Sequence, residues 1–240
     1  MIQIVYSPQW FYGHDMVIEA IGMLVLLILA ILNLQYYRLN KNKKNHLWLA
    51  ISFILLALSF LSKIITNFTI YSDVFLTKSV GNSTFVYQMI SQSDTLFDYG
   101  FLFYTIFGLI GLYILYELYQ KDHPLARIGL TLLLMASAIY FSAFPYIVFN
   151  LIAAGLLFLI TGHYYNVYKK NKHGPTRVLA ISFGILTVSH LMLLFANVQS
   201  VLYVVAEVIR LIGYLLLSIT IAMVLKDGKK INNGKKKIKN

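Results

Sequence analysis

Arg210 and Glu207 are the two residues of this chain whose type and spacing most clearly suggest chemistry. They lie three residues apart in an apolar stretch, so a helix would place them on one face, where opposite charges can meet. Inside a bilayer an ionisable group costs about 3 kcal/mol or more unless it is paired or faces water. The pair therefore predicts either recognition of a small polar or anionic ligand, or an ion pair that only locks helix packing.

Other polar side chains fall in the outer halves of neighbouring apolar stretches. We predict an outward-facing, ligand-binding pocket formed by Glu207, Arg210, His190, Ser189, Asp98 and Glu19. Each candidate also has a plainer interpretation. His190 fits a histidine bonded to a neighbouring helix. Asp98 fits a carboxylate favoured by a helix N-terminus, and Lys63 fits a cation that snorkels toward water.

The sequence lacks the residue patterns on which several kinds of enzyme and metal site depend. There is no cysteine, no HxxxH pair, no GxxxxGK[ST] loop and no GxSxG elbow. His190 has no second intramembrane histidine with which to ligate a haem. We therefore predict no catalytic residue, no metal site and no cofactor, and an enzyme is the least favoured class.

The elements that must position these residues are apolar. Hydrophobic residues make up 59% of the chain and charged residues 12%. The apolar residues occur in runs of about twenty, which is typical of bilayer-spanning helices. We predict an all-α, polytopic protein of the cell membrane, with a single seven-helix transmembrane domain over residues 1–225. The spans are expected at residues 16–37, 47–67, 97–119, 125–144, 146–168, 178–197 and 201–225.

The distribution of basic residues predicts the orientation. The net charge is +11, and Lys and Arg gather after the first, third, fifth and seventh spans rather than forming a nucleic-acid surface. The positive-inside rule then places the N-terminus outside and the C-terminus in the cytoplasm. Residues 226–240 form a basic tail, which we expect to be disordered near the inner leaflet. Anionic lipids are possible partners of this tail.

A repeated pattern organises the chain. The sequence LAISF occurs at residues 49–53 and again at 179–183, each followed in register by a Leu and a Ser, and LIG occurs at 109–111 and 211–213. These matches in the same order predict two three-helix units, about 16–119 and 146–225, joined by a linker helix at about 125–144. The long outward connection, about 68–96, is expected to be a partly ordered cap over the outer mouth.

This three-plus-one-plus-three plan, with an outward N-terminus and a basic inner tail, resembles the microbial rhodopsin type of bundle. The resemblance implies a similar fold. It does not extend to retinal, which that family holds on a lysine of the seventh helix, because residues 201–225 contain no lysine. The family's pocket tryptophans also have no counterpart, since Trp10 and Trp48 lie at span edges.

The same plan has a weaker resemblance to the PQ-loop group, which includes the SWEET-type sugar transporters. That group uses prolines in its first and fifth helices as hinges. Pro8 and Gln9 stand before the first span here, and no proline interrupts a span.

We therefore expect a seven-transmembrane sensor or receptor-like protein without retinal, acting through an unknown cytoplasmic partner. The alternative is a small-molecule or ion transporter built on parallel three-helix repeats. A third possibility is a structural membrane protein in which Glu207 and Arg210 serve packing alone.

Overall fold

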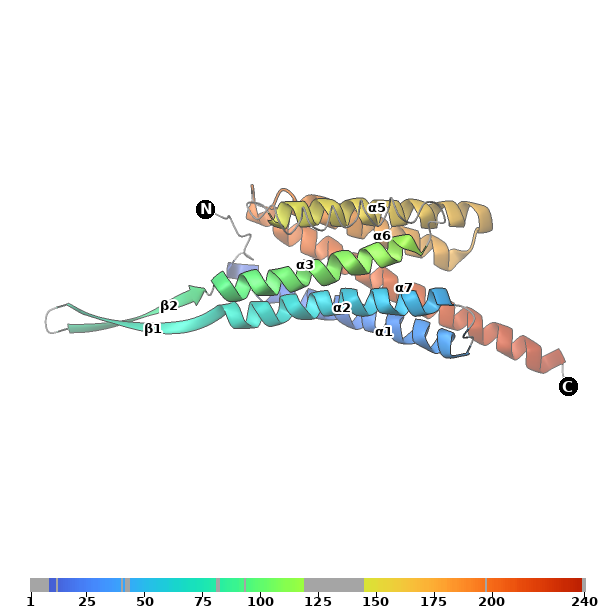
Figure 1. Cartoon of the computed structure of the whole chain (residues 1–240), viewed down its shortest axis with the longest axis horizontal. Helices are drawn as coiled ribbons and strands as arrows, with labels where there is room; N and C mark the ends of the chain where they lie inside the picture. The colour runs from blue at the N-terminus through green and yellow to red at the C-terminus, as the bar shows by residue number, and fades with distance from the viewer. Residues whose placement is uncertain are drawn as a thin grey trace.

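The computed structural model of this chain describes residues 9–11, 13–39, 41, 44–80, 83–92, 94–118, 145–196 and 198–238. In chain order its elements are η1 (Gln9–Phe11), α1 (His14–Leu39), α2 (Lys44–Ile70), β1 (Tyr71–Val80), β2 (Ser83–Gln92), α3 (Asp94–Glu117), α5 (Pro145–Asn171), α6 (Gly174–Leu193) and α7 (Ser200–Ile238). The long helices lie lengthwise beside one another, and the two strands project from one end (Figure 1).

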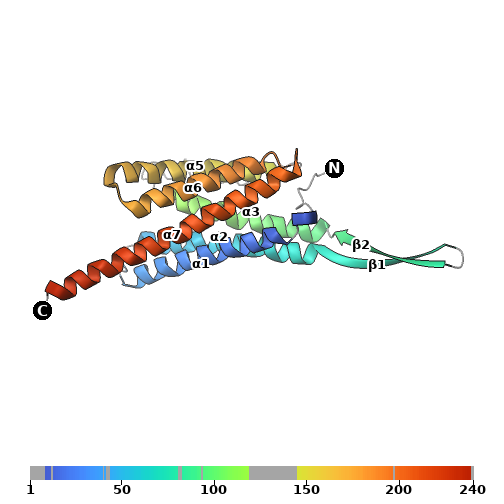
Figure 2. The same ribbon diagram turned by 180° about the vertical axis from the view of Figure 1, so that it is seen from behind.

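The helices alternate in direction along the bundle. α1, α3, α5 and α7 start at the end that carries the strands, whereas α2 and α6 run back toward it (Figures 1 and 2). We call this end the outer end, following the orientation that the basic residues predict. The starts of α1 and α7 and the last turn of α2 therefore lie at the same end.

Apolar helices form because a bilayer offers no water to bond the backbone, and a helix satisfies those groups internally. Within the described residues, six helices are long and apolar enough to cross a membrane. Large apolar side chains face outward, as Leu24, Phe158 and Leu215 do, whereas Glu19 and Glu207 are fully buried. This pattern is the reverse of a soluble helix bundle and fits a membrane-embedded protein.

The predicted seven-helix, all-α fold is corrected in two respects. Within the described residues the structure has six membrane-length helices in place of the seven predicted, and the fourth predicted span, 125–144, lies outside those residues. In addition, the chain is not all-α, because residues 71–80 and 83–92 form strands β1 and β2.

The strands form an antiparallel hairpin that extends away from the bundle instead of capping it (Figure 1). Val80 pairs with Ser83, and the residues between them are Gly81 and Asn82, types that favour tight hairpin connections. The segment STFVYQMI is rich in β-branched and aromatic residues, which favour strands. This local preference for strands favours a hairpin where a partly ordered cap was predicted.

The basic tail also differs from the prediction. α7 continues without interruption to Ile238 and projects beyond the other helices (Figure 2). Extending a helix that is already formed costs far less than starting one, and Lys is a good helix former. Residues 226–238 are therefore helical rather than disordered.

The helices pack as two three-helix units. α1, α2 and α3 contact one another in sequence, as do α5, α6 and α7, and contacts between the units are concentrated where α1 meets α7 and α3 meets α5. We call this boundary the seam. At the seam the first helix of each unit packs against the third helix of the other, so both units use the same two helices for this contact.

Two hydrogen bonds recur in equivalent places of the two units. Ser59 donates to the backbone oxygen of Tyr104 at 2.8 Å, and Ser189 donates to that of Ala206 at 2.8 Å. The two serines match in the LAISF alignment, and Tyr104 and Ala206 match in the LIG alignment. The repeat stays a prediction, which these equivalent contacts support.

Gly22 permits the close approach of α1 to α7 at the seam. A Cβ at this position would lie 2.8 Å from Tyr214 Cε2, a rigid ring atom of α7. We expect Gly22→Ala to lower the free energy of unfolding by about 1–3 kcal/mol, because overpacking forces the helices apart. Reversible unfolding in mixed micelles measures the loss.

Gly155→Ala is the matched control, because a Cβ at Gly155 meets nothing within 4 Å. That variant should be as stable as the wild type or slightly more so, since Ala is the better helix former. Equal losses in the two variants would mean that the approach of Tyr214 to Gly22 does not limit the seam.

Candidate functional site: a buried charged cluster at the seam

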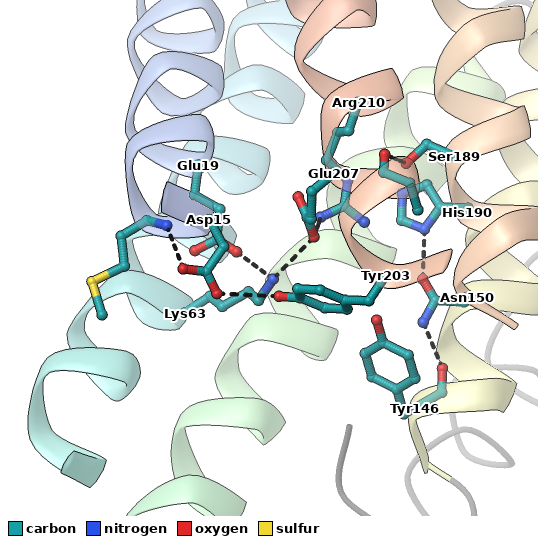
Figure 3. A network of polar contacts seen from close by, with 12 residues as sticks. Asp15, Glu19, Lys63, Tyr146, Asn150, Ser189, His190, Tyr203, Glu207 and Arg210 are labelled. Carbon is teal, nitrogen blue, oxygen red and sulfur yellow. Dashed lines mark hydrogen bonds and ion pairs between the residues drawn. The ribbon is translucent and has the colours of Figure 1, made fainter. Parts of the chain in front are cut away.

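Ionisable side chains from both units meet at the outer end of the seam. Lys63 of α2 forms an ion pair with Glu19 Oε1 of α1, and its Nζ lies 3.6 Å from Glu207 Oε1 of α7 (Figure 3). The same Glu207 oxygen accepts a hydrogen bond from Arg210 Nη1 at 2.8 Å. Glu19, Glu207 and Arg210 are at most 1% exposed. Glu207 therefore bridges two cations in the bundle interior.

Asp15 adds a second polar contact across the seam. The hydroxyl of Tyr203 on α7 donates to Asp15 Oδ2 at 3.2 Å, and the backbone N–H of Met16 donates to Asp15 Oδ1 at 2.9 Å (Figure 3). Asp15 is buried, in the first turn of α1, where a helix dipole favours a carboxylate. We define the charged cluster as Asp15, Glu19, Lys63, Glu207 and Arg210.

Helical spacing explains how a mostly apolar sequence builds this cluster. Asp15 and Glu19 are four residues apart on α1, so they share one face. Tyr203, Glu207 and Arg210 follow the same rule on α7. The surrounding positions of these helices are apolar, and packing the two polar faces together removes them from the lipid.

Part of the cluster has no hydrogen-bond partner among the described residues. The buried atoms without a hydrogen-bond partner include Arg210 Nε and Nη2, Glu207 Oε2 and Glu19 Oε2. In a guanidinium group, Nε–H and the adjacent terminal N–H form a planar fork that matches the two oxygens of a carboxylate. Arg210 thus uses Nη1 to hold Glu207 and keeps one such edge unused within the described part of the chain.

A neutral branch of polar contacts lies on the α5 and α6 side. Asn150 Nδ2 donates to the backbone oxygen of Tyr146 at 2.8 Å, which fixes the amide so that its oxygen faces His190 Nδ1, also at 2.8 Å (Figure 3). His190 Nδ1 must then carry the hydrogen of this contact. The imidazole is held by Asn150, and in its neutral form its Nε2 is an acceptor.

A cavity of about 50 Å³ lies between the units, lined by side chains from all six helices. Phe and Leu side chains dominate its wall, and the polar contributors include His190, Tyr104 and Tyr214. A single water needs about 10–15 Å³ of such space, so the cavity holds a few waters at most. Any larger ligand at this depth requires the seam to move.

The structure brings together only part of the predicted pocket. Glu19, Glu207 and Arg210 meet in the charged cluster, and His190 joins the neighbouring branch through Asn150. Ser189 does not contribute, because its hydroxyl donates to the backbone oxygen of Ala206 and so joins α6 to α7. Asp98 belongs to α3, but its side chain lies outside the described residues.

Four further polar residues were missed. They are Asp15, Lys63, Tyr203 and Asn150. The prediction that Lys63 snorkels toward water is wrong, since it pairs with two carboxylates and its side chain is 18% exposed. A usable signal existed in the like charges of Asp15 and Glu19 on one helix face, which demand a cation from elsewhere.

Comparison of the chain with protein-family models, with curated proteins and with solved structures gave no match.

Proposed function

We propose that this chain is a multi-pass sensor of the cell membrane, in which a small polar ligand with a carboxylate-like group binds the free edge of Arg210. The supporting observation is the pair of donors Nε and Nη2, buried in a side chain that is 1% exposed and without a hydrogen-bond partner among the described residues. Buried donors of this kind cost about 1–3 kcal/mol each when unmet. An acceptor arriving from outside would recover that cost.

Ligand binding would act on the seam through Glu207. A carboxylate on the free edge of Arg210 would place a second negative charge beside Glu207. Repulsion between the two carboxylates would loosen the contacts of Glu207, including the contact with Lys63 that crosses from one unit to the other. Because the ligand would favour a more open seam, it would shift the balance between two arrangements of the units.

The helix that carries Glu207 and Arg210 offers a route for the signal. α7 runs unbroken from the outer end to Ile238, beyond the other helices (Figures 1 and 2). A tilt at the seam would therefore move its far end as a rigid element. With the N-terminus outside, that basic end would meet an unknown cytoplasmic protein or anionic lipid headgroups.

Arg210→Lys tests the ligand proposal, because it keeps the positive charge and removes the planar fork. The full-length protein in nanodiscs is heated with acetate, succinate, glutamate or inorganic phosphate as probes. We expect at least one probe, at about a hundred times its Kd, to raise the wild-type Tm by about 5–10 °C. Arg210→Lys should lose that response while keeping its own Tm close to that of the wild type. Equal responses of the two proteins to every probe would contradict the proposal.

Transport is the second candidate, favoured by the position of the charged cluster. The cluster lies on a boundary between two units that contact each other mainly through two helix pairs, where parallel-repeat transporters place their substrates. Uptake of a bound probe into proteoliposomes would support transport. Binding without uptake would support the sensor.

A further inference from the structure

The charged cluster contains more carboxylates than cations. Asp15, Glu19 and Glu207 face Lys63 and Arg210, so three negative groups meet two positive ones when all are ionised. The cluster would then carry one excess negative charge in a region shielded from water. An uncompensated charge in such a place is strongly unfavourable, and proteins avoid it by neutralising the group.

In the described part of the chain, two carboxylate oxygens of the cluster lack a hydrogen-bond donor. Glu19 Oε2 and Glu207 Oε2 are buried and have no hydrogen-bond partner among the described residues, and both side chains are 0% exposed. Lys63 contacts the other oxygen of each of these carboxylates. Each bare oxygen needs a donor that Lys63 and Arg210 do not supply.

Among the described residues, the groups around the cluster offer no further positive charge. On α7, Tyr203 already donates to Asp15. His190 of α6 gives its Nδ1 hydrogen to Asn150, and its ring is buried. The remaining titratable groups that interact with Lys63 or Arg210 are hydroxyls: Tyr104 of α3, Tyr146 of α5 and Tyr214 of α7.

We propose that the charged cluster binds one proton, shared among the carboxylates of Asp15, Glu19 and Glu207, and that this proton helps to hold the seam closed. Within the described residues no group of three His, Asp or Glu side chains is placed to hold a metal ion, which favours a proton as the neutralising species. A proton between neighbouring carboxylates gives one oxygen a donor and removes the excess charge. The inference concerns the protein without ligand and does not rest on the proposed sensor function.

The pH dependence of thermal stability tests this inference. If the folded chain holds a proton that the unfolded chain releases near neutral pH, stability must fall as pH rises. The wild-type Tm is measured in nanodiscs in choline chloride from about pH 5 to pH 9. It should fall by about 3 °C per pH unit while the folded chain keeps the proton that the unfolded chain has lost, and should level off once the folded chain also loses it. Glu19→Gln removes the excess charge, so its Tm should fall less steeply and should match or exceed the wild-type Tm at high pH.

Glu117→Gln is the matched control. Glu117 is the last residue of α3, so it lies at the end of the bundle opposite the charged cluster. It should keep the wild-type slope. Asp15→Asn provides a second variant within the cluster and should flatten the slope as Glu19→Gln does. Parallel slopes in the wild type, Glu19→Gln and Asp15→Asn would overturn the proposal. So would a wild-type Tm at high pH that NaCl restores and choline chloride does not, because the neutralising species would then be Na⁺.

Discussion

Lys63→Met is expected to lower the free energy of unfolding by about 3–5 kcal/mol, the cost of breaking a buried ion pair by removing one partner. The substitution leaves Glu19 without its ion-pair partner and takes away one of two cations near Glu207. Three carboxylates then face a single cation, so one bound proton no longer neutralises the cluster. Unfolding in mixed micelles at neutral pH measures the effect.

Two further variants separate charge from packing in the Lys63 experiment. Lys63→Met combined with Glu19→Gln restores the original charge balance and should recover much of the loss. Lys169→Met is the control, because Lys169 is exposed and lies over the Tyr165 ring at 4.8 Å from its centroid. Its effect should stay within about 0.5 kcal/mol, as for most surface substitutions. A Lys63→Met variant no less stable than Lys169→Met would show that Lys63 does not neutralise buried carboxylates.

Arg210→Met is expected to cost about 3–5 kcal/mol, and clearly more than Glu207→Gln. Both variants break the same 2.8 Å hydrogen bond. Arg210→Met leaves one more negative charge than a single bound proton neutralises. Glu207→Gln instead leaves two carboxylates facing two cations, and its amide oxygen can still accept from Arg210. The same unfolding experiment compares the two proteins.

The double variant, Glu207→Gln with Arg210→Met, removes one charge of each sign and should be more stable than Arg210→Met alone. A pair that served packing alone would give similar losses for the two single variants. If Glu207→Gln proved the more damaging substitution, the charge count of the cluster would be wrong.

The transmembrane helices were predictable because the bilayer imposes a simple rule on sequence. A helix about twenty apolar residues long satisfies its own backbone, so α1, α2, α3, α5, α6 and α7 appear as apolar runs. The hairpin was not predicted, because the β-branched residues of 83–92 lie among polar ones, and pairing with 71–80 depends on a partner strand. The fourth span that the same length rule predicts, 125–144, lies outside the described residues.

The site was predictable only where its contacts are local. Glu207 and Arg210 meet within one helix, so their spacing revealed them. Lys63 meets Glu19 across two helices, and nothing in the sequence near Lys63 encodes that contact. Ser189 seemed suitable for a ligand, yet its hydroxyl bonds the next helix, as Ser59 does in the other unit.

We infer that the charged cluster holds the two three-helix units together at the seam, and a distance across the seam tests this inference most directly. The chain has no cysteine, so spin labels can be attached at single introduced cysteines. Suitable positions are Val17 of α1 and Val188 of α6, which are 59% and 47% exposed and belong to different units. Pulsed electron resonance in nanodiscs should give one narrow distance distribution in the otherwise wild-type protein and a longer, broader one with Lys63→Met. Superimposable distributions in the two proteins would contradict the account.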